Sequence, residues 1–373
     1  MPRRSTACGR PERTHEIACT EKYGANPLDP NFDIFEVVTS ATPSALPART
    51  SASPRSSMDP LPDVSDGPIG QIAYSSANPF EIHHILCALD AAPAQPMFGS
   101  LLVPEHASRE PMPCVVACHG SLGWRGHHHE HIVRWLESGI AVFRVHSFEA
   151  RSVASVVEDQ MAVTHAMLLA DAYRALALLV RHPRIDGSRI GLAGWSLGGT
   201  VALYGAWSPI AEALAPDGER FAAHLPVYPA AHLRPEEKRW TGAPVRVLHG
   251  AEDNYTPLHF VLELADELRP YGVEIDVRVY PGGHHAFDSV EPKAWLPGAV
   301  RLGRRTVTID TLGDMWVELA DGTRKSLNEP SERLAGFRAA ANLGAHIGGH
   351  WEARRQGLAD SDAFFHETLL GGA

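Results

Sequence analysis

From about residue 68 onward, short apolar runs alternate with longer segments in which apolar residues recur at helical spacing. The short runs predict strands over 81–89, 97–103, 114–118, 140–145, 189–193, 221–227, 245–248 and 274–280. Helical spacing predicts helices over 129–136, 160–180, 200–207 and 258–268. Strands that alternate with helices imply parallel pairing through right-handed crossovers. We therefore predict an α/β fold with a mostly parallel central sheet and helices on both faces.

The two ends of the chain depart from this pattern. Between residues 41 and 62, ten of 22 residues are Pro or Ser, and such a segment cannot bury enough apolar surface to offset its chain entropy. We predict a disordered or loosely packed arm over 1–62 and a single domain over 63–373. Near the end, Asp321-Gly322 marks a turn between two short strands, and a final helical region is expected over 331–370.

Charge and composition limit the partners. The 373 residues include 33 Lys and Arg against 44 Asp and Glu, a formal net charge of −11. An acidic chain is poorly suited to sequence-independent binding of nucleic acid or of an anionic membrane surface. No segment approaches the ~20 apolar residues of a membrane-spanning helix. We expect neither partner.

The expected compartment is the cytoplasm. The five cysteines form no CxxC pair and are odd in number, which favours free thiols in a reducing compartment. Cys114 and Cys118 lie in an apolar run and are expected to be buried in a strand. The basic start, Met1 to Arg4, is followed by no apolar stretch typical of a secretory signal.

The main chemical signal is Gly194-Trp195-Ser196-Leu197-Gly198. It follows a predicted strand and precedes a predicted helix, the context of a nucleophile elbow, in which a sharp turn lifts the serine above the sheet. Glycines are required because side chains at those positions would clash in the turn. Ser196 is the predicted nucleophile.

A serine hydroxyl needs a base to accept its proton, and the base needs an acid to orient it. His284 and His285 compete as the base, because both follow the predicted strand 274–280. Asp253 follows the strand 245–248 and is the predicted acid, with Glu252 as the alternative. All these residues follow strands at the edge where open α/β sheets place their sites. The order Ser, Asp, His is that of α/β-hydrolases.

An oxyanion hole completes the chemistry. One donor is expected to be the backbone N–H of Leu197, the residue after the nucleophile. The loop after the early strand reads His119-Gly-Ser-Leu-Gly123, and we assign the second donor to the N–H of Ser121, with Leu122 as the fallback.

The chain from about residue 68 to its end resembles the dienelactone hydrolase family of α/β-hydrolases. The matching motifs are His119-Gly-x-x-Gly123, Ser147-Phe148 followed by Arg151, Gly194-Trp-Ser-x-Gly-Gly199, His249-Gly-x-x-Asp253-x-x-x-Pro257 and Tyr280-Pro-Gly-x-x-His285-Ala-Phe287. The resemblance favours His285 over His284 as the base. It also implies that Arg151 corresponds to one of two arginines that hold a substrate carboxylate, whereas the position of the second is occupied by Ser289. The family's namesake has a cysteine nucleophile, so Ser196 favours a carboxylesterase on this scaffold.

Several residues near the predicted triad are candidates for contact with substrate: Leu122, Trp195, Arg151, Tyr255 and Phe287. For Trp195, Tyr255 and Phe287 the alternative is core packing, and for Arg151 it is an ion pair. The cluster His127-His-His-Glu-His131 is read as a polar start of a helix, with pocket lining or metal binding as alternatives. No matching metal-ligand set and no nucleotide motif is visible, so no metal or cofactor is expected.

The sequence thus predicts a serine hydrolase that cleaves small carboxylic esters through an acyl-enzyme intermediate. The alternatives are a dienelactone-type lactone hydrolase and a catalytically silent binding protein with the same fold. A serine peptidase of the acylaminoacyl type uses the same three residues but usually carries a propeller domain. The long segment 290–328 after the predicted base is expected to cover the site and shape substrate choice. Homo-oligomer formation is left open.

Overall fold

A computed structural model of the protein describes residues 61–105 and 111–371. Its central sheet has eight strands in the order β1-β2-β4-β3-β5-β6-β8-β9. β1 and β2 pair antiparallel, as do β2 and β4, and the remaining neighbours are parallel. The bounds are β1 (Gly70–Ala77), β2 (Ala94–Leu102), β3 (Met112–Cys118), β4 (Ala141–Val145), β5 (Ile185–Trp195), β6 (Ala223–Val227), β8 (Val245–Gly250) and β9 (Ile275–Tyr280). The predicted mostly parallel α/β sheet is confirmed.

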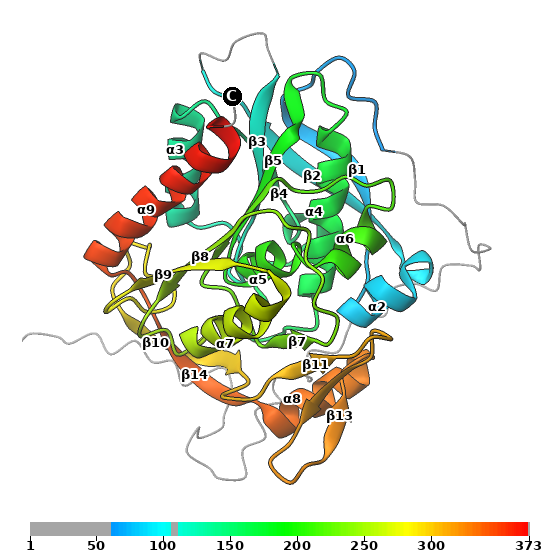
Figure 1. Ribbon diagram of the computed structural model, residues 1–373, viewed down its shortest axis with the longest axis vertical. Coiled ribbons are helices and arrows are strands. Elements are labelled where there is room, and N and C mark those ends of the chain that lie inside the picture. Colours follow the sequence, from blue (N-terminus) through cyan, green and yellow to red (C-terminus); the bar gives the residue numbers. More distant parts are fainter. Residues whose placement is uncertain (1–60, 106–110, 372–373) are drawn as a thin grey trace, which may run out of the picture. The chain divides into compact units, whose positions relative to one another are not determined.

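Helices cover both faces of the sheet, and β3 shows why its sequence is apolar throughout. Cys114, Val116 and Cys118 pack into the core beneath α4 and α5, whereas Val115 and Ala117 pack into the core beneath α3 and α9. A strand buried on both faces carries a continuous apolar run. Figure 1 shows α3 and α9 together on one side of the sheet and α4, α5 and α6 on the other. The helices are α2 (Ile82–Cys87), α3 (Gly126–Glu137), α4 (His165–Leu179), α5 (Leu197–Tyr204), α6 (Ser208–Leu214), α7 (Leu258–Leu268) and α9 (Trp351–Phe365).

Two predicted elements are wrong. The segment 81–89, predicted as a strand, forms helix α2, and β2 pairs instead with β1, a strand that the sequence analysis did not predict. In α2 the buried residues are Ile82 and Ile85, three positions apart, which is helical rather than alternating spacing. The final helical region, predicted over 331–370, is interrupted by strand β14 (Asn342–Ile347).

An insertion follows β9 and builds a small second layer. β10 (Ala294–Arg301) pairs with β14, and β11 (Val307–Ile309), β12 (Met315–Glu318) and β13 (Arg324–Ser326) form an antiparallel sheet. β11 also pairs in parallel with β7 (Leu233–Pro235), which lies after β6 of the main domain. The predicted turn at Asp321-Gly322 connects β12 to β13. The insertion is therefore joined to the main domain by backbone hydrogen bonds.

A buried ion cluster provides a second attachment. Arg333 on α8 (Pro330–Ala340) donates from Nη1 to Oε2 of Glu81 over 2.6 Å, and His165 Nε2 lies 2.8 Å from Glu81 Oε1. All three side chains are buried. Burial would raise the pKa of the Glu81 carboxyl, but the charges of Arg333 and His165 outweigh it and lower this pKa to about 2. Glu81 thus remains ionised and holds α8 against the start of α4.

This cluster predicts that the protein loses stability in acid. Unfolded Glu81 binds its proton near pH 4.5 and folded Glu81 only near pH 2, so its stabilisation is complete above pH 4.5 and is lost as the pH falls toward 2. Between pH 7 and pH 3 we expect Glu81 to account for about 2 kcal/mol of lost unfolding free energy. Urea unfolding at pH 7, 5, 4 and 3 measures it. In the Glu81→Gln variant, the loss of unfolding free energy between pH 7 and pH 3 should be smaller by this amount. Equal losses in the variant and the wild type would contradict the assignment.

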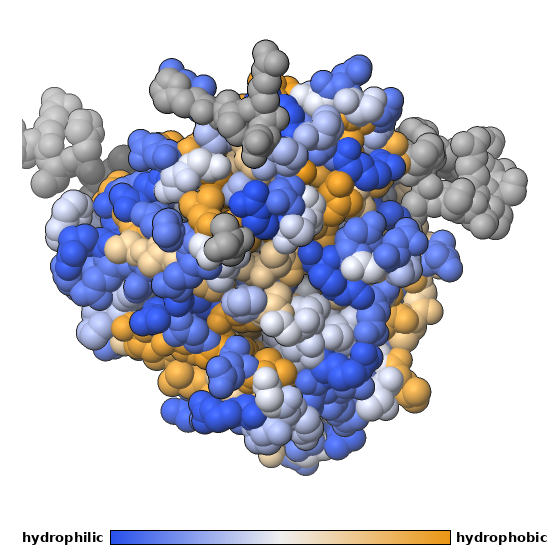
Figure 2. Space-filling model, turned by 45° about the horizontal axis from the view of Figure 1, so that its top comes forward, coloured by the Kyte–Doolittle hydropathy of each residue, from blue (hydrophilic) through white to orange (hydrophobic). Residues whose placement is uncertain are grey.

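On the face seen in Figure 2, polar residues predominate and apolar ones appear between them. Among the described residues, no helix has the length and apolar character needed to cross a membrane. Cys114 and Cys118 are buried and unpaired, as predicted for strand thiols, and burial raises the pKa of both. Apart from residues 61–62, the predicted N-terminal arm lies outside the described residues.

Candidate active site

Ser196 stands in a strained turn between β5 and α5. Its backbone has φ 54° and ψ −110°, a region that residues other than glycine rarely occupy. The turn is tight enough that a Cβ on Gly194 would lie 2.1 Å from the carbonyl oxygen of Gly198. A Cβ on Gly198 would lie 2.1 Å from the carbonyl oxygen of Cys118 in β3. The two glycines therefore allow the turn, as the sequence pattern predicts.

These contacts predict a severe effect of Gly198→Ala. A Cβ at position 198 would lie 2.1 to 2.7 Å from three backbone atoms of Cys118 and His119, so the sheet or the turn must move, at a cost of about 3 kcal/mol or more in unfolding free energy. Gly126 at the start of α3 is a matched control, because a Cβ there meets no atom within 4 Å. Thermal unfolding of the two variants should show a large loss of stability for Gly198→Ala and no loss of stability for Gly126→Ala. Equal stabilities would contradict this description of the turn.

The structure brings Ser196, His285 and Asp253 together from three separate segments. His285 Nε2 lies 2.9 Å from Ser196 Oγ, and His285 Nδ1 lies 2.8 Å from Asp253 Oδ2. Asp253 follows β8 and His285 follows β9, so the carboxyl ends of the parallel strands β5, β8 and β9 supply all three groups. His284 turns away and its Nδ1 lies 2.9 Å from the carbonyl oxygen of Glu252, whose side chain is exposed.

Asp253 is fixed by more than the histidine. Its Oδ1 accepts hydrogen bonds from the backbone N–H groups of Tyr255 and Thr256, at 2.8 and 2.9 Å. Its Oδ2 also lies 2.9 Å from the hydroxyl oxygen of Thr256. Burial would raise the pKa of the Asp253 carboxyl, but the charge of His285 and these hydrogen bonds outweigh burial and lower the pKa. Asp253 is therefore ionised, with Oδ2 directed at His285. The sequence analysis did not single out Thr256.

The predicted oxyanion donors lie beside Ser196. Leu197 is the first residue of α5, where an N–H group has no partner within the helix. The loop that carries Ser121 runs close to the nucleophile, because a Cβ on Gly120 would lie 3.5 Å from Cβ of Ser196. Ser121 lines the cavities on both sides of Ser196, whereas the fallback Leu122 lines only one of them. Their role as oxyanion donors stays a prediction.

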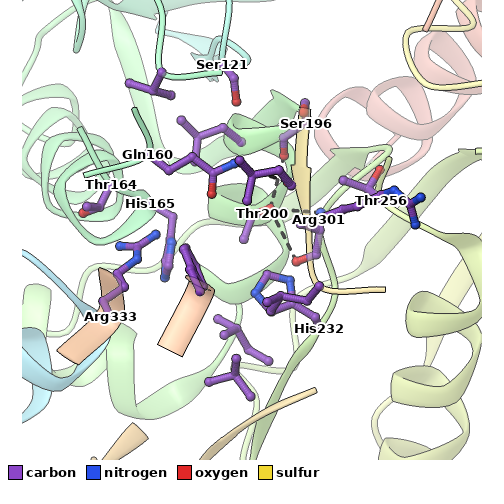
Figure 3. Close-up of a pocket in the computed structure, with 18 of the residues that line it drawn as sticks. Ser121, Gln160, Thr164, His165, Ser196, Thr200, His232, Thr256, Arg301 and Arg333 are labelled. Atoms are coloured by element: carbon purple, nitrogen blue, oxygen red, sulfur yellow. Dashed lines mark hydrogen bonds between the residues drawn. The ribbon is translucent and has the colours of Figure 1, made fainter. Parts of the chain in front are cut away.

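Two cavities meet at Ser196 and Ser121. The insertion-side cavity, shown in Figure 3, is enclosed on one side by residues of the insertion. Its apolar wall consists of Val156, Val163, Leu197, Ala230, Leu233, Phe260, Val300, Leu302, Val307, Met315, Leu327 and Phe337. The histidine-side cavity is lined by His285 together with His127, His128, Trp195 and Tyr228. Segment 290–328, predicted to cover the site, does supply walls of the first cavity.

The predicted substrate contacts divide into two groups. Leu122, Trp195 and Tyr255 line the histidine-side cavity, and Tyr255 also lines the other. Arg151 lines neither cavity. Its Nη1 lies 2.7 Å from Oδ2 of the buried Asp171, so the ion pair named as its alternative is what the structure contains. Phe287 is fully buried and packs against Tyr228 and Tyr280, which is the alternative of core packing.

A buried carboxylate that the sequence analysis missed lies behind this site. Asp288 accepts hydrogen bonds from the Trp195 indole at 3.1 Å and the Tyr228 hydroxyl at 2.9 Å. His131 Nε2 lies 3.2 Å from the same carboxyl group, and His127 is near it. Burial would raise the pKa of Asp288, but the charges of His127 and His131 and the hydrogen bond from His131 hold it well below its usual range. A lone acid in a loop gives no sequence signal for such burial.

The histidine cluster at the start of α3 is thereby explained. His127 and His128 line the histidine-side cavity, and His131 links Asp288 to Ser361 of α9, with Nδ1 3.1 Å from the Ser361 hydroxyl oxygen. Within residues 61–105 and 111–371, no group of three or more His, Cys, Asp or Glu side chains could hold a metal ion. His127 and His128 thus fit the alternative of pocket lining, whereas the buried contacts of His131 were not predicted.

With this geometry in place, the family can be assigned. The sequence profile of the dienelactone hydrolase family matches residues 98–302, more than half of the chain. The chain belongs to the dienelactone hydrolase family. The match runs from β2 through β10, so it includes the segments that carry Ser196, Asp253 and His285. No curated protein matches the chain in sequence.

The chain is also similar to several solved structures at low sequence identity. A proposed dienelactone hydrolase from Klebsiella pneumoniae subsp. pneumoniae is 18% identical with a TM-score of 0.46, over 80% of this chain and 99% of that one. A promiscuous dienelactone hydrolase-like phosphotriesterase from metagenomic libraries is 17% identical with a TM-score of 0.45, over the same shares of the two chains. A propionate-bound esterase from Thermogutta terrifontis is 16% identical with a TM-score of 0.42, over 52% of this chain and 81% of that one.

Proposed function

We propose that this dienelactone hydrolase family member is a serine carboxylesterase with Ser196 as nucleophile, His285 as base and Asp253 as the orienting acid. The observation that carries the proposal is the continuous pair of contacts from Ser196 Oγ to His285 Nε2 and from His285 Nδ1 to Asp253 Oδ2. A nucleophile within hydrogen-bond reach of a base that a third group orients is the arrangement that activates a serine.

The reaction has two steps. His285 Nε2 accepts the proton of Ser196 as Oγ forms a bond to the ester carbonyl carbon, and the N–H groups of Leu197 and Ser121 bind the resulting oxyanion. The imidazolium then protonates the alkoxide, the carbon–oxygen bond breaks, and the alcohol leaves. Water, deprotonated by the same histidine, attacks the acyl-enzyme, and the acid leaves as Ser196 Oγ takes the proton back. Asp253 stabilises the imidazolium in both steps.

The two cavities take different halves of the ester. The leaving alcohol must receive its proton from His285, so it lies on the side that His285 lines, which is the histidine-side cavity. The acyl group then occupies the insertion-side cavity, whose wall is mainly apolar. Because the insertion supplies part of that wall, it sets the preference for the acyl group.

The alternatives are less well supported. A dienelactone-type hydrolase would use Arg151 to bind a substrate carboxylate. The Arg151 guanidinium is instead paired with Asp171 and lines neither cavity. A silent binding protein would have no need of a nucleophile in a strained turn 2.9 Å from a histidine. A serine peptidase would use the same three residues, with His285 protonating the leaving amine, and the anilide in the substrate panel below tests for it.

The test is hydrolysis of p-nitrophenyl butyrate beside the matching p-nitroanilide, together with labelling by a fluorophosphonate. We expect turnover of the ester, little turnover of the anilide, and a phosphonyl adduct that peptide mass spectrometry locates on Ser196. Absence of both hydrolysis and adduct would support the binding protein instead. An adduct on another residue would mean that the nucleophile is wrongly assigned.

A further inference from the structure

The insertion-side cavity is not uniformly apolar. In Figure 3, His165, Arg333 and His232 lie across the cavity from Ser196, and Gln160 lies between them and Ser121. The four come from different segments: His165 begins α4, His232 precedes β7, Arg333 lies on α8, and Gln160 precedes α4. An acyl chain that enters from Ser196 therefore passes apolar side chains and ends at polar ones.

Arg333 has hydrogen-bonding capacity that the ion cluster does not use. Only its Nη1 has a hydrogen-bond partner among the described residues, which is Glu81 Oε2 at 2.6 Å. A guanidinium carries five N–H donors, and buried donors without acceptors are costly. The Arg333 side chain is buried, packs its guanidinium over Phe80 and Phe337, and lines the cavity. Its remaining donors call for an acceptor inside the cavity.

The neighbours of Arg333 offer further polar groups. No ring nitrogen of His232 has a hydrogen-bond partner in the described part of the chain, and burial lowers the pKa of this histidine to about 3, so it is neutral. A neutral imidazole offers one donor and one acceptor. Within residues 61–105 and 111–371, the Gln160 side chain makes only a long contact of 3.4 Å from Nε2 to the carbonyl oxygen of Val300. This end of the cavity thus presents several polar groups that are free to bind an occupant.

The charges decide which acceptor fits. Glu81 already pairs with two groups of this cluster, because its Oε2 lies 2.6 Å from Arg333 Nη1 and its Oε1 lies 2.8 Å from His165 Nε2. A second carboxylate bound to Arg333 would lie close to Glu81 in a medium that screens charge weakly, and the two would repel each other. A neutral oxygen, such as that of a ketone or hydroxyl, accepts the unused N–H groups without this repulsion.

We infer that this polar subsite of Arg333, His165, His232 and Gln160 binds a neutral oxygen acceptor at the far end of the acyl chain, so that the substrates are esters of oxo or hydroxy acids. The inference rests on the proposed function and names its substrate class. The apolar wall holds the body of the chain, and the subsite selects for the oxygen.

The experiment compares p-nitrophenyl esters of oxo acids with methyl-branched esters of the same length, scanning the oxygen along the acyl chain. We expect kcat/KM for the oxo ester to exceed that of its branched match by roughly 10- to 100-fold at one position, because a hydrogen bond to a charged donor is gained there. In Glu81→Gln/Arg333→Met, which removes both members of the ion pair, this ratio should fall toward one. The ratio is taken within each variant, so a partial loss of folded protein cancels.

A second variant guards against failure of the first to fold. His232→Phe removes a ring that has no side-chain hydrogen bond in the described residues, and it should lower the same ratio. The control is Met315→Leu in the apolar wall, which should change both esters alike. A ratio near one at every position in the wild type overturns the inference, and so does a preference for the corresponding ω-carboxy ester.

Failure of this inference is distinguishable from failure of the proposed function. If all esters are hydrolysed in a reaction that requires Ser196 but oxo and branched chains react equally, only the subsite assignment is wrong. If no ester is hydrolysed, or hydrolysis does not require Ser196, the proposed function fails and the inference falls with it.

Discussion

Replacing Ser196 with alanine is expected to lower kcat for p-nitrophenyl butyrate by about 10⁵- to 10⁶-fold, the loss typical of a serine hydrolase without its nucleophile. The Ser196 hydroxyl is the atom that lies 2.9 Å from His285 Nε2, and no acyl-enzyme can form without it. The oxyanion donors are backbone groups and survive the change, so ~10³- to 10⁴-fold of catalysis over water should remain. The measurement is the steady-state rate at pH 8 with enough protein to quantify the residual activity.

The control for this change is Ser188→Ala, the same substitution at an exposed position of strand β5. It should leave kcat unchanged, and both variants should unfold at nearly the wild-type temperature. A Ser196→Ala protein with wild-type activity would show that another residue carries the reaction. Wild-type protein that keeps its activity after complete reaction with a fluorophosphonate would point to the same conclusion.

The sequence predicted Ser196, Asp253 and His285 as a triad because each of them leaves a local signal. Ser196 is marked by the glycines that its turn requires, and Asp253 and His285 each follow an apolar run of strand length. Parallel strands bring their carboxyl ends to one edge of the sheet, so three local signals fix a spatial arrangement. Between His284 and His285, however, only the family motif favours His285, since a register of one residue decides which ring faces Ser196.

The contacts that the sequence did not reveal are long-range ones. Glu81 is the first residue of the predicted strand 81–89, yet it binds Arg333, 252 positions away, on a helix of the insertion. Asp288 follows the predicted base by three residues, but its role depends on Trp195, Tyr228 and His131 from three other elements. For Arg151 the sequence motif suggested a contact with substrate, but in the fold its partner is Asp171. Periodicity identifies a buried face but not which distant residue covers it.

Under the proposed function, this division between the sheet and the insertion places the substrate specificity in the insertion. The reacting groups come from the sheet, whereas the acyl cavity is enclosed by the insertion after β9, whose small sheet is joined to β7 and whose helix α8 is held by Glu81. Variation in the insertion can change the acyl preference without moving Ser196, His285 or Asp253. Substrate choice must therefore be read from the folded insertion rather than from the triad motifs.

Asp253→Asn is expected to lower kcat by ~10⁴-fold while leaving the fold intact, and the surroundings of Asp253 determine why. Two backbone N–H groups, from Tyr255 and Thr256, donate to Oδ1. In asparagine the amide oxygen must occupy that position, because an NH₂ group there would oppose two donors. The amide nitrogen then takes the place of Oδ2, 2.8 Å from His285 Nδ1, and donates to it. His285 is thereby held with its proton on Nε2, where it cannot accept the proton of Ser196.

The neighbouring acid provides a matched control, since Glu252 is the alternative orienting residue and its side chain is exposed. Glu252→Gln removes the same charge one position away and should leave kcat within about twofold of the wild type, because surface substitutions have small effects. Steady-state kinetics of both variants with p-nitrophenyl butyrate decide between the two acids. A loss of less than about tenfold in Asp253→Asn would mean that the imidazole does not depend on Asp253 for its tautomer. A large loss in Glu252→Gln alone would transfer the orienting role to Glu252 and would require the loop after β8 to rearrange during catalysis.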